Sequence, residues 1–407
     1  MSCPDSGPTW FTISPPSVHI NGSSYLTLYA PVQLVYFFTA VLVTIPNTYA
    51  LRLAVLPASV YFLYQAGIHL DMSNGDPLQE VNNCGLLTLV TIIFMRVITW
   101  TFHSKHFLRT SKYKHANERT ISQIMFDGAD LCFNFRGIGW DWSDRQAVID
   151  HPSHKAQREL SASARRQRFI HGNSVWYFAS SALFEIALYI HLNNRLAELD
   201  ERSLSFLFLR ALNSLLYPIM TYSNLSGTYN LYALIGVCIC RQDTEQWPPF
   251  YNKPWLSTSL TEFWGKRWHQ AFRYTFSNVG GKPLSLLFGR AGFVLGTFFA
   301  SGVFHDMGFW GMRRGRGLCC FTTPYFVLNG VGCVVEAAFR RLTGKKVCGL
   351  PGRVWAWSWL VGCGLVTMSP FCTHELLRPF EDAVITQPFY LTYVLVMKSA
   401  RLCSLTT

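Results

Sequence analysis

Charged residues are scarce in this sequence. Of its 407 residues, only 14% are Asp, Glu, Lys or Arg, whereas a soluble domain averages about 25%. Half of the residues are hydrophobic and 15% are aromatic. So little charge argues against a soluble globular protein. Several separate apolar segments instead approach the roughly 20 residues that a helix needs to cross a bilayer, which predicts an integral, multi-pass membrane protein.

Other patterns are missing as well, and each absence excludes something. The twelve cysteines form no C-x-x-C pair and no Cys/His metal spacing, so we expect neither a metal site nor a disulfide framework. No permanently bound cofactor is expected. No G-x-S-x-G sequence occurs, which argues against a covalent acyl-serine. The apolar segments lack the alternation of transmembrane strands and therefore predict helices. The first basic residue is Arg52, so we expect no cleavable signal peptide.

The net charge of +12 does not require a nucleic-acid partner, because the basic residues lie in loops between the apolar segments. Positive cytoplasmic loops account for such an excess. The polar loop 103–172 is basic overall and is predicted to be cytoplasmic. The N-terminus and the acidic loop 71–80 would then be lumenal. The sequon at Asn21 is accordingly a candidate glycosylation site.

The predicted fold is all-α: a helical bundle of about eight to ten spans that encloses a reaction chamber, with one interfacial amphipathic helix. We expect a disordered lead-in over residues 1–24 and a single membrane domain over residues 25–400. Residues 204–240 predict either one broken helix or two spans, with the break at Pro218. The other predicted spans are Leu26–Thr44, Tyr49–Leu70, Gly85–Phe102, Val175–Leu192, residues 284–310, Cys319–Phe339, Trp355–Cys372 and Phe389–Met397.

The segment 284–310 carries a histidine and an aspartate, His305 and Asp306, near its end. Titratable groups are costly in lipid and usually face a cavity or the bundle interior. At 3.6 residues per turn, Thr297, Ser301 and His305 share one helix face, and we assign Thr297 and Ser301 to the substrate cavity. The alternative is a structural histidine that bonds to a neighbouring helix.

A second stripe on the same helix consists of small residues, Gly292, Gly296 and Ala300, which permit the close approach of another helix. In the segment Val175–Leu192, Glu185 lies near the middle. A carboxyl group at that depth must be protonated, paired or facing water. Two interpretations stay open for Glu185, a structural hydrogen bond and a place in the substrate cavity.

Residues 257–276 predict a short helix at the membrane surface. Ser259 and Glu262 match a capping box, so the helix should begin at about Leu260. Aromatic side chains on one face and basic side chains on the other are typical of an interfacial helix. Surface attachment alone would explain this pattern. The functional interpretation is that Lys266 and Arg273 bind a phosphorylated ligand while His269 points to the reacting centre.

The stretch Asn134–Trp142 contains two glycines that flank Ile138 and permit a tight turn. It is not a phosphate-binding loop, because G-x-G alone lacks the later glycine and the strand–helix context. Taken by itself, it predicts a structural turn at the membrane surface.

Together, three stretches resemble a known family. Ser301–Asp306 (SGVFHD), Glu262–Gln270 (EFWGKRWHQ) and Arg136–Trp142 (RGIGWDW) are similar to motifs of the wax-synthase-like branch of the membrane-bound O-acyltransferases. The likeness is greatest to fungal members that acetylate terpenoid and meroterpenoid hydroxyls, and it extends over most of the chain.

The resemblance implies a helical bundle in the endoplasmic reticulum membrane that uses acetyl-CoA as co-substrate and a hydrophobic terpenoid alcohol as acceptor. It places the family's essential histidine at His305. The second motif residue, often an asparagine in the wider superfamily, falls at His269, whose role is therefore open. We assign donor binding to Lys266 and Arg273, together with Trp268 and Arg136.

The chemistry of ester formation suits His305. Acyl transfer from a thioester to a hydroxyl needs a base for the hydroxyl proton, and burial favours the neutral imidazole that can accept it. The tetrahedral oxyanion needs donors; His269, Ser301 and Thr297 are candidates that the sequence does not rank. Asp306 lies about 100° around the helix from His305. We group it with the catalytic residues but expect it to set a neighbour's geometry and not to complete a triad.

Two alternatives remain. The first is a transferase that makes long-chain wax or sterol esters. The second is a transporter, in which an intramembrane histidine and glutamate would relay protons. A transporter would be expected to show paired halves with interrupted helices, and the sequence contains no such repeat.

Overall fold

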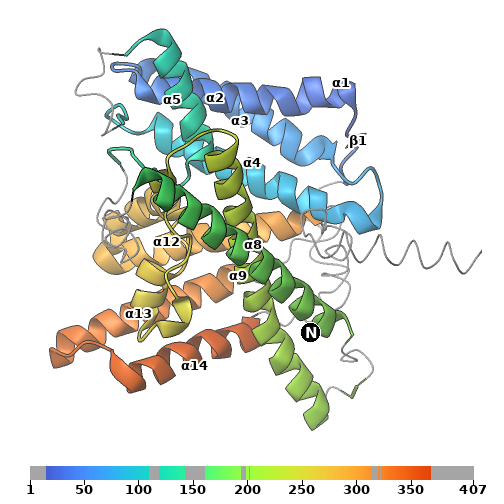
Figure 1. Cartoon of the computed structure of the whole chain (residues 1–407), viewed down its shortest axis with the longest axis vertical. Helices are drawn as coiled ribbons and strands as arrows, with labels where there is room; N and C mark the ends of the chain where they lie inside the picture. The colour runs from blue at the N-terminus through green and yellow to red at the C-terminus, as the bar shows by residue number, and fades with distance from the viewer. Residues whose placement is uncertain are drawn as a thin grey trace, which may run out of the picture. The chain divides into compact units, whose positions relative to one another are not determined.

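Helices dominate this chain (Figure 1). The computed structural model describes residues 15–109, 119–142, 161–193, 199–200, 202–312, 320 and 322–367. The chain divides into two compact units, one formed by residues 1–145 and 255–363 and the other by residues 146–254 and 364–407. Each unit is described by itself. The predicted all-α class is confirmed, whereas the single membrane domain over residues 25–400 stays a prediction.

The first unit begins within the segment that was predicted to be disordered, and for residues 18–24 that prediction was wrong. β1 (Val18–His19) pairs in parallel with β2 (Leu70–Asp71). Asn21 then caps the turn α1 (Gly22–Ser24), because its side chain accepts a hydrogen bond from the Ser24 N–H at 2.9 Å. Strand pairing and capping give this segment a defined structure; residues 1–14 lie outside the described residues. The pairing also places the N-terminal segment beside the start of the acidic loop; the lumenal orientation of both stays a prediction.

Three long helices of the first unit follow the predicted spans closely. They are side by side in Figure 1, and their cores share one apolar cluster. Within it, the Tyr36 ring stacks on Trp100 with 5.1 Å between the ring centroids. The helices are α2 (Ala30–Thr44), which continues the wide turn η2 (Tyr25–Tyr29), α3 (Tyr49–His69), and α4 (Glu80–Thr101), which follows the short turn η3 (Pro77–Gln79).

The sequence suggested a continuous loop over residues 103–172, but the structure shows helices within this region. α5 (Ile121–Phe133) forms inside it, with Thr120 and Gln123 making a capping box at its start. This S/T-x-x-E/Q spacing is a helix-start signal that was overlooked in a polar region. α8 also begins within the region, at Ala162.

The predicted catalytic helix over residues 284–310 lies inside α12 (Lys282–Met312), which is kinked and not straight. Phe288 and Gly289 leave the helical conformation. Gly289 has φ 57° and ψ −139°, a combination that essentially only glycine adopts. The chain folds back on itself at this point, so that α11 (Arg273–Phe276), the wide turn η9 (Ser277–Gly281) and the start of α12 form the first arm of a helical hairpin.

Small residues hold the two arms of this hairpin together. A Cβ atom at Gly296 would lie 2.2 Å from the carbonyl oxygen of Gly280, and one at Gly292 would lie 2.3 Å from that of Leu284. Only glycine allows backbones to approach so closely. The predicted small-residue stripe is therefore confirmed as a close-packing surface, but its partner is the preceding segment of the same chain.

Two further described helices lie in the first unit, the second of them up to Cys363. They are α13 (Thr322–Thr343) and α14 (Gly349–Thr367). α13 packs along α12, where the ring of Phe298 lies over Gly330. α14 covers the face of α13 where a Cβ at Gly332 would lie 2.8 Å from the indole nitrogen of Trp359. The last predicted span, Phe389–Met397, lies outside the described residues.

The second unit contains α8 (Ala162–Leu192) and α9 (Leu204–Cys238), which pack against each other. Their contact includes small residues, with the hydroxyls of Ser180 and Ser226 3.1 Å apart, and an apolar cluster that contains Phe184 and Leu216. α9 is one helix that continues through Pro218. This decides between the two alternatives for residues 204–240, and the break predicted at Pro218 was wrong. Membrane helices tolerate an internal proline because neighbouring groups satisfy the freed backbone carbonyl.

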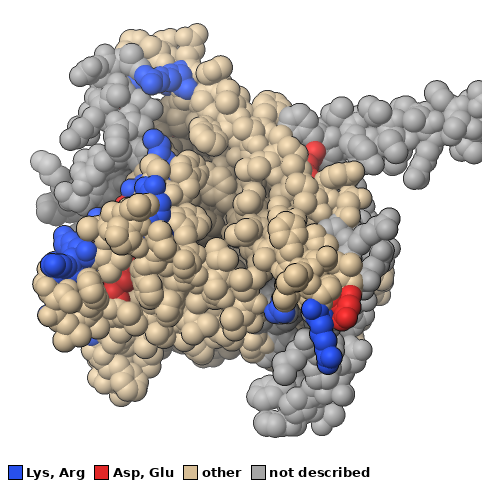
Figure 2. All heavy atoms as spheres, turned by 90° about the horizontal axis from the view of Figure 1, so that it is seen from below, with Lys and Arg blue, Asp and Glu red and all other residues tan. Residues whose placement is uncertain are grey.

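The described residues include five helices that are long and apolar enough to cross a membrane. α8, α13 and α14, which were also predicted as spans, are not among the five. Most of the described surface in Figure 2 carries no charge, and many large apolar side chains are exposed on the helices. The chain is an integral, multi-pass membrane protein. The five helices are Gly22–Thr44, Tyr49–His69, Glu80–Thr101, Leu204–Cys238 and the hairpin Arg273–Met312.

Candidate active site

His305 lies near the C-terminal end of α12, one turn after Ser301. Its Nδ1 atom is 2.7 Å from the backbone carbonyl oxygen of Ser301. A carbonyl oxygen can only accept a hydrogen bond, so Nδ1 carries the proton of the neutral ring and Nε2 keeps a lone pair. The residue is half-buried. This geometry leaves Nε2 as the atom of His305 that can take up a proton.

Asp306, the next residue, is tied to the start of α13. Its Oδ1 accepts hydrogen bonds from the Thr322 N–H at 2.8 Å and the Thr322 hydroxyl at 2.6 Å, and its Oδ2 accepts one from the Thr323 N–H at 3.0 Å. A carboxylate at this position satisfies free N–H groups of the helix and is favoured by the helix dipole. The contacts support a positioning role for Asp306, which joins α12 to α13 beside the histidine.

The second motif begins as the sequence predicts. α10 (Leu260–Glu262) starts at the expected residue, and the Ser259 hydroxyl accepts a hydrogen bond from the Glu262 N–H at 3.0 Å. The Glu262 carboxylate differs from a full capping box, because it bonds to Thr258 and to Arg267. Burial alone would raise the pKa of Glu262, but these hydrogen bonds outweigh it and hold the pKa below its usual value.

The predicted single helix over residues 257–276 is broken, so this prediction was wrong. After α10 the chain forms a wide turn of π-helix, η8 (Phe263–Arg267). The next residue, Trp268, is extended with φ −70° and ψ 158°. Gln270 Nε2 donates to the carbonyl oxygens of Trp264 and Trp268 at 3.0 and 2.7 Å. It thereby satisfies two backbone groups that are at the end of the helical turn. Helix resumes only at α11.

The break changes the arrangement that was predicted for the basic side chains. Lys266 lies before it and Arg273 after it, so they do not share one continuous helix face. Both residues are exposed, and Arg273 donates to the carbonyl oxygen of Gly265 at 3.2 Å. Their assignment to donor binding stays a prediction.

His269 lies in the bend between Trp268 and α11, close to His305. Burial, followed by the nearby charges of His305 and Arg136, lowers the pKa of His269 to about 3. At neutral pH its imidazole is therefore uncharged and has one N–H donor and one acceptor nitrogen. The structure thus brings together the two histidines that the sequence assigned to one site.

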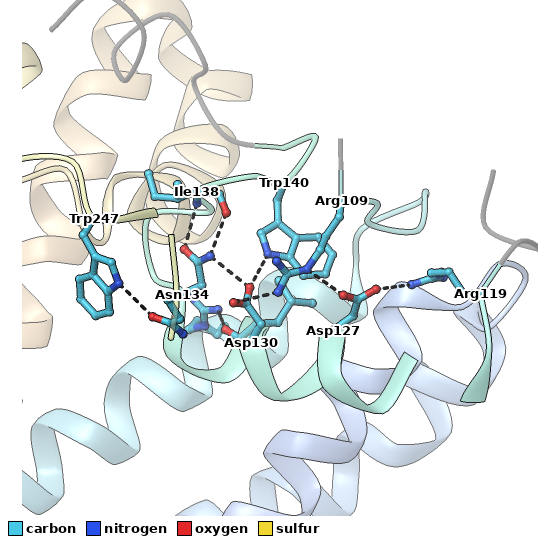
Figure 3. A network of polar contacts seen from close by, with 11 residues as sticks. Arg109, Arg119, Asp127, Asp130, Asn134, Ile138, Trp140 and Trp247 are labelled. Carbon is cyan, nitrogen blue, oxygen red and sulfur yellow. Dashed lines mark hydrogen bonds and ion pairs between the residues drawn. The ribbon is translucent and has the colours of Figure 1, made fainter. Parts of the chain in front are cut away.

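The third motif is held by an ion-pair network on α5 (Figure 3). Arg109 contacts Asp127 at 2.7 Å and Asp130 at 2.8 Å, and Arg119 contacts Asp127 at 3.2 Å. Asp130 also accepts a hydrogen bond from the indole N–H of Trp140 at 2.8 Å. Asp127 and both arginines are buried, where such charges are tolerated only when they are paired. Sequence analysis did not single out these four charged residues.

The network fixes the turn that carries Arg136. Asn134 bonds to Ile138 through both its amide oxygen, at 2.9 Å, and its amide nitrogen, at 3.0 Å (Figure 3). Gly137 and Gly139 have φ of 67° and 83°, which confirms the tight turn predicted from the two glycines. Arg136 projects from this turn close enough to His269 to lower its pKa. The second and third motifs therefore meet at one site.

Glu336 of α13 is a further buried member of the framework, and sequence analysis did not identify it. Its carboxylate accepts hydrogen bonds from the N–H groups of Leu260 at 2.6 Å and Thr261 at 2.9 Å, and from the indole of Trp355 at 3.0 Å. It caps α10 from another helix. The available signal was an acidic residue inside a predicted apolar span.

The remaining predicted site residues are not all brought together. Thr297 donates to the carbonyl oxygen of Phe293 at 2.7 Å and packs against Gly281 in the hairpin. It lies two turns, roughly 12 Å along the helix, from His305. Glu185 lies half-buried on α8 of the second unit, and its place in the substrate cavity stays a prediction. No group of His, Cys, Asp and Glu among the described residues could hold a metal ion.

Comparisons with known proteins bear on this site. Residues 247–328, which contain the second motif and His305, match the model of the membrane bound O-acyl transferase family. The chain is 24% identical over 356 residues to acetyltransferase pyr8 of Aspergillus fumigatus, which covers 79% of this chain and 81% of that protein. It is 27% identical over 165 residues to acetyltransferase eriL of Hericium erinaceus, covering 38% of this chain and 43% of that protein.

A plant enzyme matches over a shorter stretch. The chain is 32% identical over 107 residues to the long-chain-alcohol O-fatty-acyltransferase of Simmondsia chinensis, which covers 24% of this chain and 30% of that protein. The predicted resemblance to the wax-synthase-like branch is therefore confirmed, and with it the enzyme class, an acyltransferase.

Proposed function

We propose that this chain, a member of the membrane-bound O-acyltransferases, transfers an acetyl group from acetyl-CoA to a hydroxyl of a hydrophobic terpenoid alcohol. The observation that carries the proposal is the hydrogen bond from His305 Nδ1 to the Ser301 carbonyl, which leaves Nε2 free to act as a base. A second histidine, His269, lies close by. A base beside a neutral hydrogen-bond donor is what ester formation from a thioester needs.

In the proposed reaction, Nε2 of His305 takes the hydroxyl proton while the hydroxyl oxygen attacks the thioester carbon. The tetrahedral intermediate collapses, the carbon–sulfur bond breaks, and the CoA thiolate leaves. The imidazolium then returns its proton to the sulfur, so the products are the acetate ester and free CoA. Atoms and charges balance without a metal or a redox partner.

Stabilisation of the oxyanion is assigned to His269. With a pKa of about 3, it is neutral at pH 7 and can donate one N–H without competing for the hydroxyl proton. The Ser301 hydroxyl is a second candidate donor, whereas Thr297 is two turns away from His305. Asp306 acts through α13 as a positioning residue. Lys266, Arg273, Trp268 and Arg136 are proposed to hold the phosphorylated donor.

The acetyl donor is proposed from the relatives, and the terpenoid acceptor from the resemblance of the three motifs to fungal acetyltransferases. The protein named acetyltransferase pyr8 aligns with most of this chain. A second candidate is a long-chain-alcohol acyltransferase, which the similarity to the Simmondsia chinensis enzyme favours. An integral membrane enzyme suits either acceptor, since both partition into lipid. We place the enzyme in the endoplasmic reticulum membrane.

The test is turnover by purified protein in lipid nanodiscs. Acetyl-CoA and farnesol, a terpenoid alcohol used as probe, are incubated with the enzyme, and farnesyl acetate is measured by mass spectrometry against His305→Gln as the inactive reference. Ester from acetyl-CoA supports the proposal. Ester from palmitoyl-CoA and hexadecanol, with none from acetyl-CoA, would establish the long-chain alternative. No ester from either pair would leave the transporter to be tested by proton flux.

A further inference from the structure

The two histidines of the active site are joined by a closed circuit of aromatic rings. On one side, the His305 ring stacks on Phe326 with 4.6 Å between the ring centroids, and the Phe326 centroid lies 5.7 Å from that of Trp264. The path continues from Trp264 to Trp268 at 6.0 Å and from Trp268 to His269 at 5.6 Å. On the other side, His305 lies 5.0 Å from Phe304, Phe304 lies 5.2 Å from Phe272, and Phe272 lies 6.3 Å from His269. We call this circuit the aromatic collar.

The collar is held in place by hydrogen bonds and close packing. The indole N–H of Trp264 donates to Asn329 Oδ1 at 3.1 Å, and the Asn329 amide donates to the Tyr325 carbonyl at 2.9 Å. Asn329 is fully buried. On the opposite side, Phe304 is buried on the second arm of the hairpin, whose glycines fix the spacing of the arms. Ring positions in such a framework resist displacement.

The spacing of the rings restricts where an acyl chain can go. For a methylene chain to pass between two rings, the rings must be roughly 7–8 Å apart, twice the contact distance of carbon atoms. Every neighbouring pair in the collar has a centroid distance between 4.6 and 6.3 Å. A chain therefore cannot leave sideways between neighbours. The methyl group of an acetyl donor needs no such exit, whereas a longer acyl chain must extend along the ring faces of the collar.

Phe326 has a particular place in this arrangement. Its ring is inclined by only 25° to the His305 ring and covers one face of the imidazole. An acyl carbon that reacts near Nε2 must lie next to this ring. Because Phe326 is half-buried, it borders accessible space and is not locked inside a helix contact.

We infer that the aromatic collar selects short acyl groups, with Phe326 as the specificity-determining residue. The inference rests on the proposed function, since it concerns the acyl donor of that reaction. According to this inference, the side chains around His305 determine whether the enzyme uses an acetyl donor or a long-chain acyl donor.

The test compares acyl-CoA donors of two, four, six and eight carbons with farnesol as a common acceptor. In the wild-type enzyme, kcat/KM should fall steeply beyond the shortest donors. Phe326→Ala should raise the ratio of kcat/KM for hexanoyl-CoA to that for acetyl-CoA by roughly ten-fold or more, because a pocket that gains room for methylenes loses discrimination of this size. Phe326→Leu, which keeps more of the volume, should give a smaller rise. Phe339→Ala on the exposed side of the same helix is the matched control and should leave the ratio unchanged.

The outcomes separate this inference from the proposed function. If Phe326→Ala is active with acetyl-CoA and its donor ratio equals that of the wild type, the collar does not select chain length. If the wild type prefers octanoyl-CoA over acetyl-CoA, the inference is also overturned, while acyl transfer itself stands. If a variant turns over too slowly, thermal stabilisation by CoA, acetyl-CoA and hexanoyl-CoA replaces turnover. Hexanoyl-CoA that stabilises the wild type as strongly as acetyl-CoA would contradict the collar.

Discussion

Replacing Gly296 with alanine should destabilise the protein through the hairpin that carries His305. The added Cβ would lie 2.2 Å from the carbonyl oxygen of Gly280, whereas a carbon–carbon contact is comfortable at about 3.5–4.0 Å. The two arms must therefore separate by about 1 Å or more. Overpacking of this kind costs about 1–3 kcal/mol. We expect a lower thermal midpoint in detergent and a loss of transfer activity, because His305 lies on the displaced arm.

Gly85→Ala provides the matched control for this prediction. Gly85 is also a helical glycine, on α4, but no atom lies within 4 Å of the position that its Cβ would take. Alanine is favoured over glycine in a helix by up to about 1 kcal/mol, so this variant should be as stable as the wild type or more so. If Gly296→Ala unfolds at the same temperature as Gly85→Ala, the two arms are not in the close contact described, and the reasoning fails.

Four further predictions concern the site itself. His305→Gln keeps a hydrogen-bonding group but no base, and should lower kcat by roughly 10²–10⁴ at unchanged protein yield; near-normal turnover would refute the general-base role. Asp306→Asn should lower the free energy of unfolding by about 1–3 kcal/mol, because an amide NH₂ group replaces one of the two oxygens that accept hydrogen bonds from α13 and leaves a buried N–H unsatisfied; its effect on kcat should be milder than that of His305→Gln. Joint replacement of Lys266 and Arg273 by Gln should raise the KM for acetyl-CoA and not that for the alcohol, leaving kcat nearly intact; an unchanged donor KM assigns both cations to the membrane surface. The pKa of His269 is about 3 in the folded chain and about 6.5 in the unfolded chain, so the unfolded chain binds more protons between these pH values. Stability should therefore fall as the pH is lowered from about 6.5 toward about 3. The thermal midpoint of His269→Gln should fall less over the same range.

Local signals in the sequence predicted much of the fold. Apolar runs of bilayer length located α2, α3 and α4, because nothing but helix satisfies the backbone in lipid. The capping box located the start of α10 at Leu260, since capping depends only on residues three apart. The two glycines at 137 and 139 predicted a turn because their φ values are determined locally.

Contacts between distant segments could not be predicted in the same way. The hairpin turn at Gly289 lies inside an apolar run in which Arg290 is the only charge before His305, and one charge does not distinguish a turn from a continuous helix, so the run was interpreted as one straight span. The break at Trp268 arises from the Gln270 amide, which bonds to two backbone carbonyls; a periodic pattern of aromatic and basic residues gives no sign of it. Pro218 shows the opposite case, a strong local signal for a break that the packing of α9 overrides.

Two buried carboxylates explain how the histidines of separate motifs share one site. Asp306 on α12 binds the start of α13, and Glu336 further along α13 binds the start of α10. α10 leads directly into the wide turn and the bend that carries His269. Each carboxylate satisfies backbone N–H groups that a helix cannot satisfy itself, so the same bonds that stabilise the helix ends also set the relative positions of the two histidines. The chain therefore uses helix capping between helices to place the segments that carry its two histidines, while the Ser301 carbonyl orients the His305 ring itself.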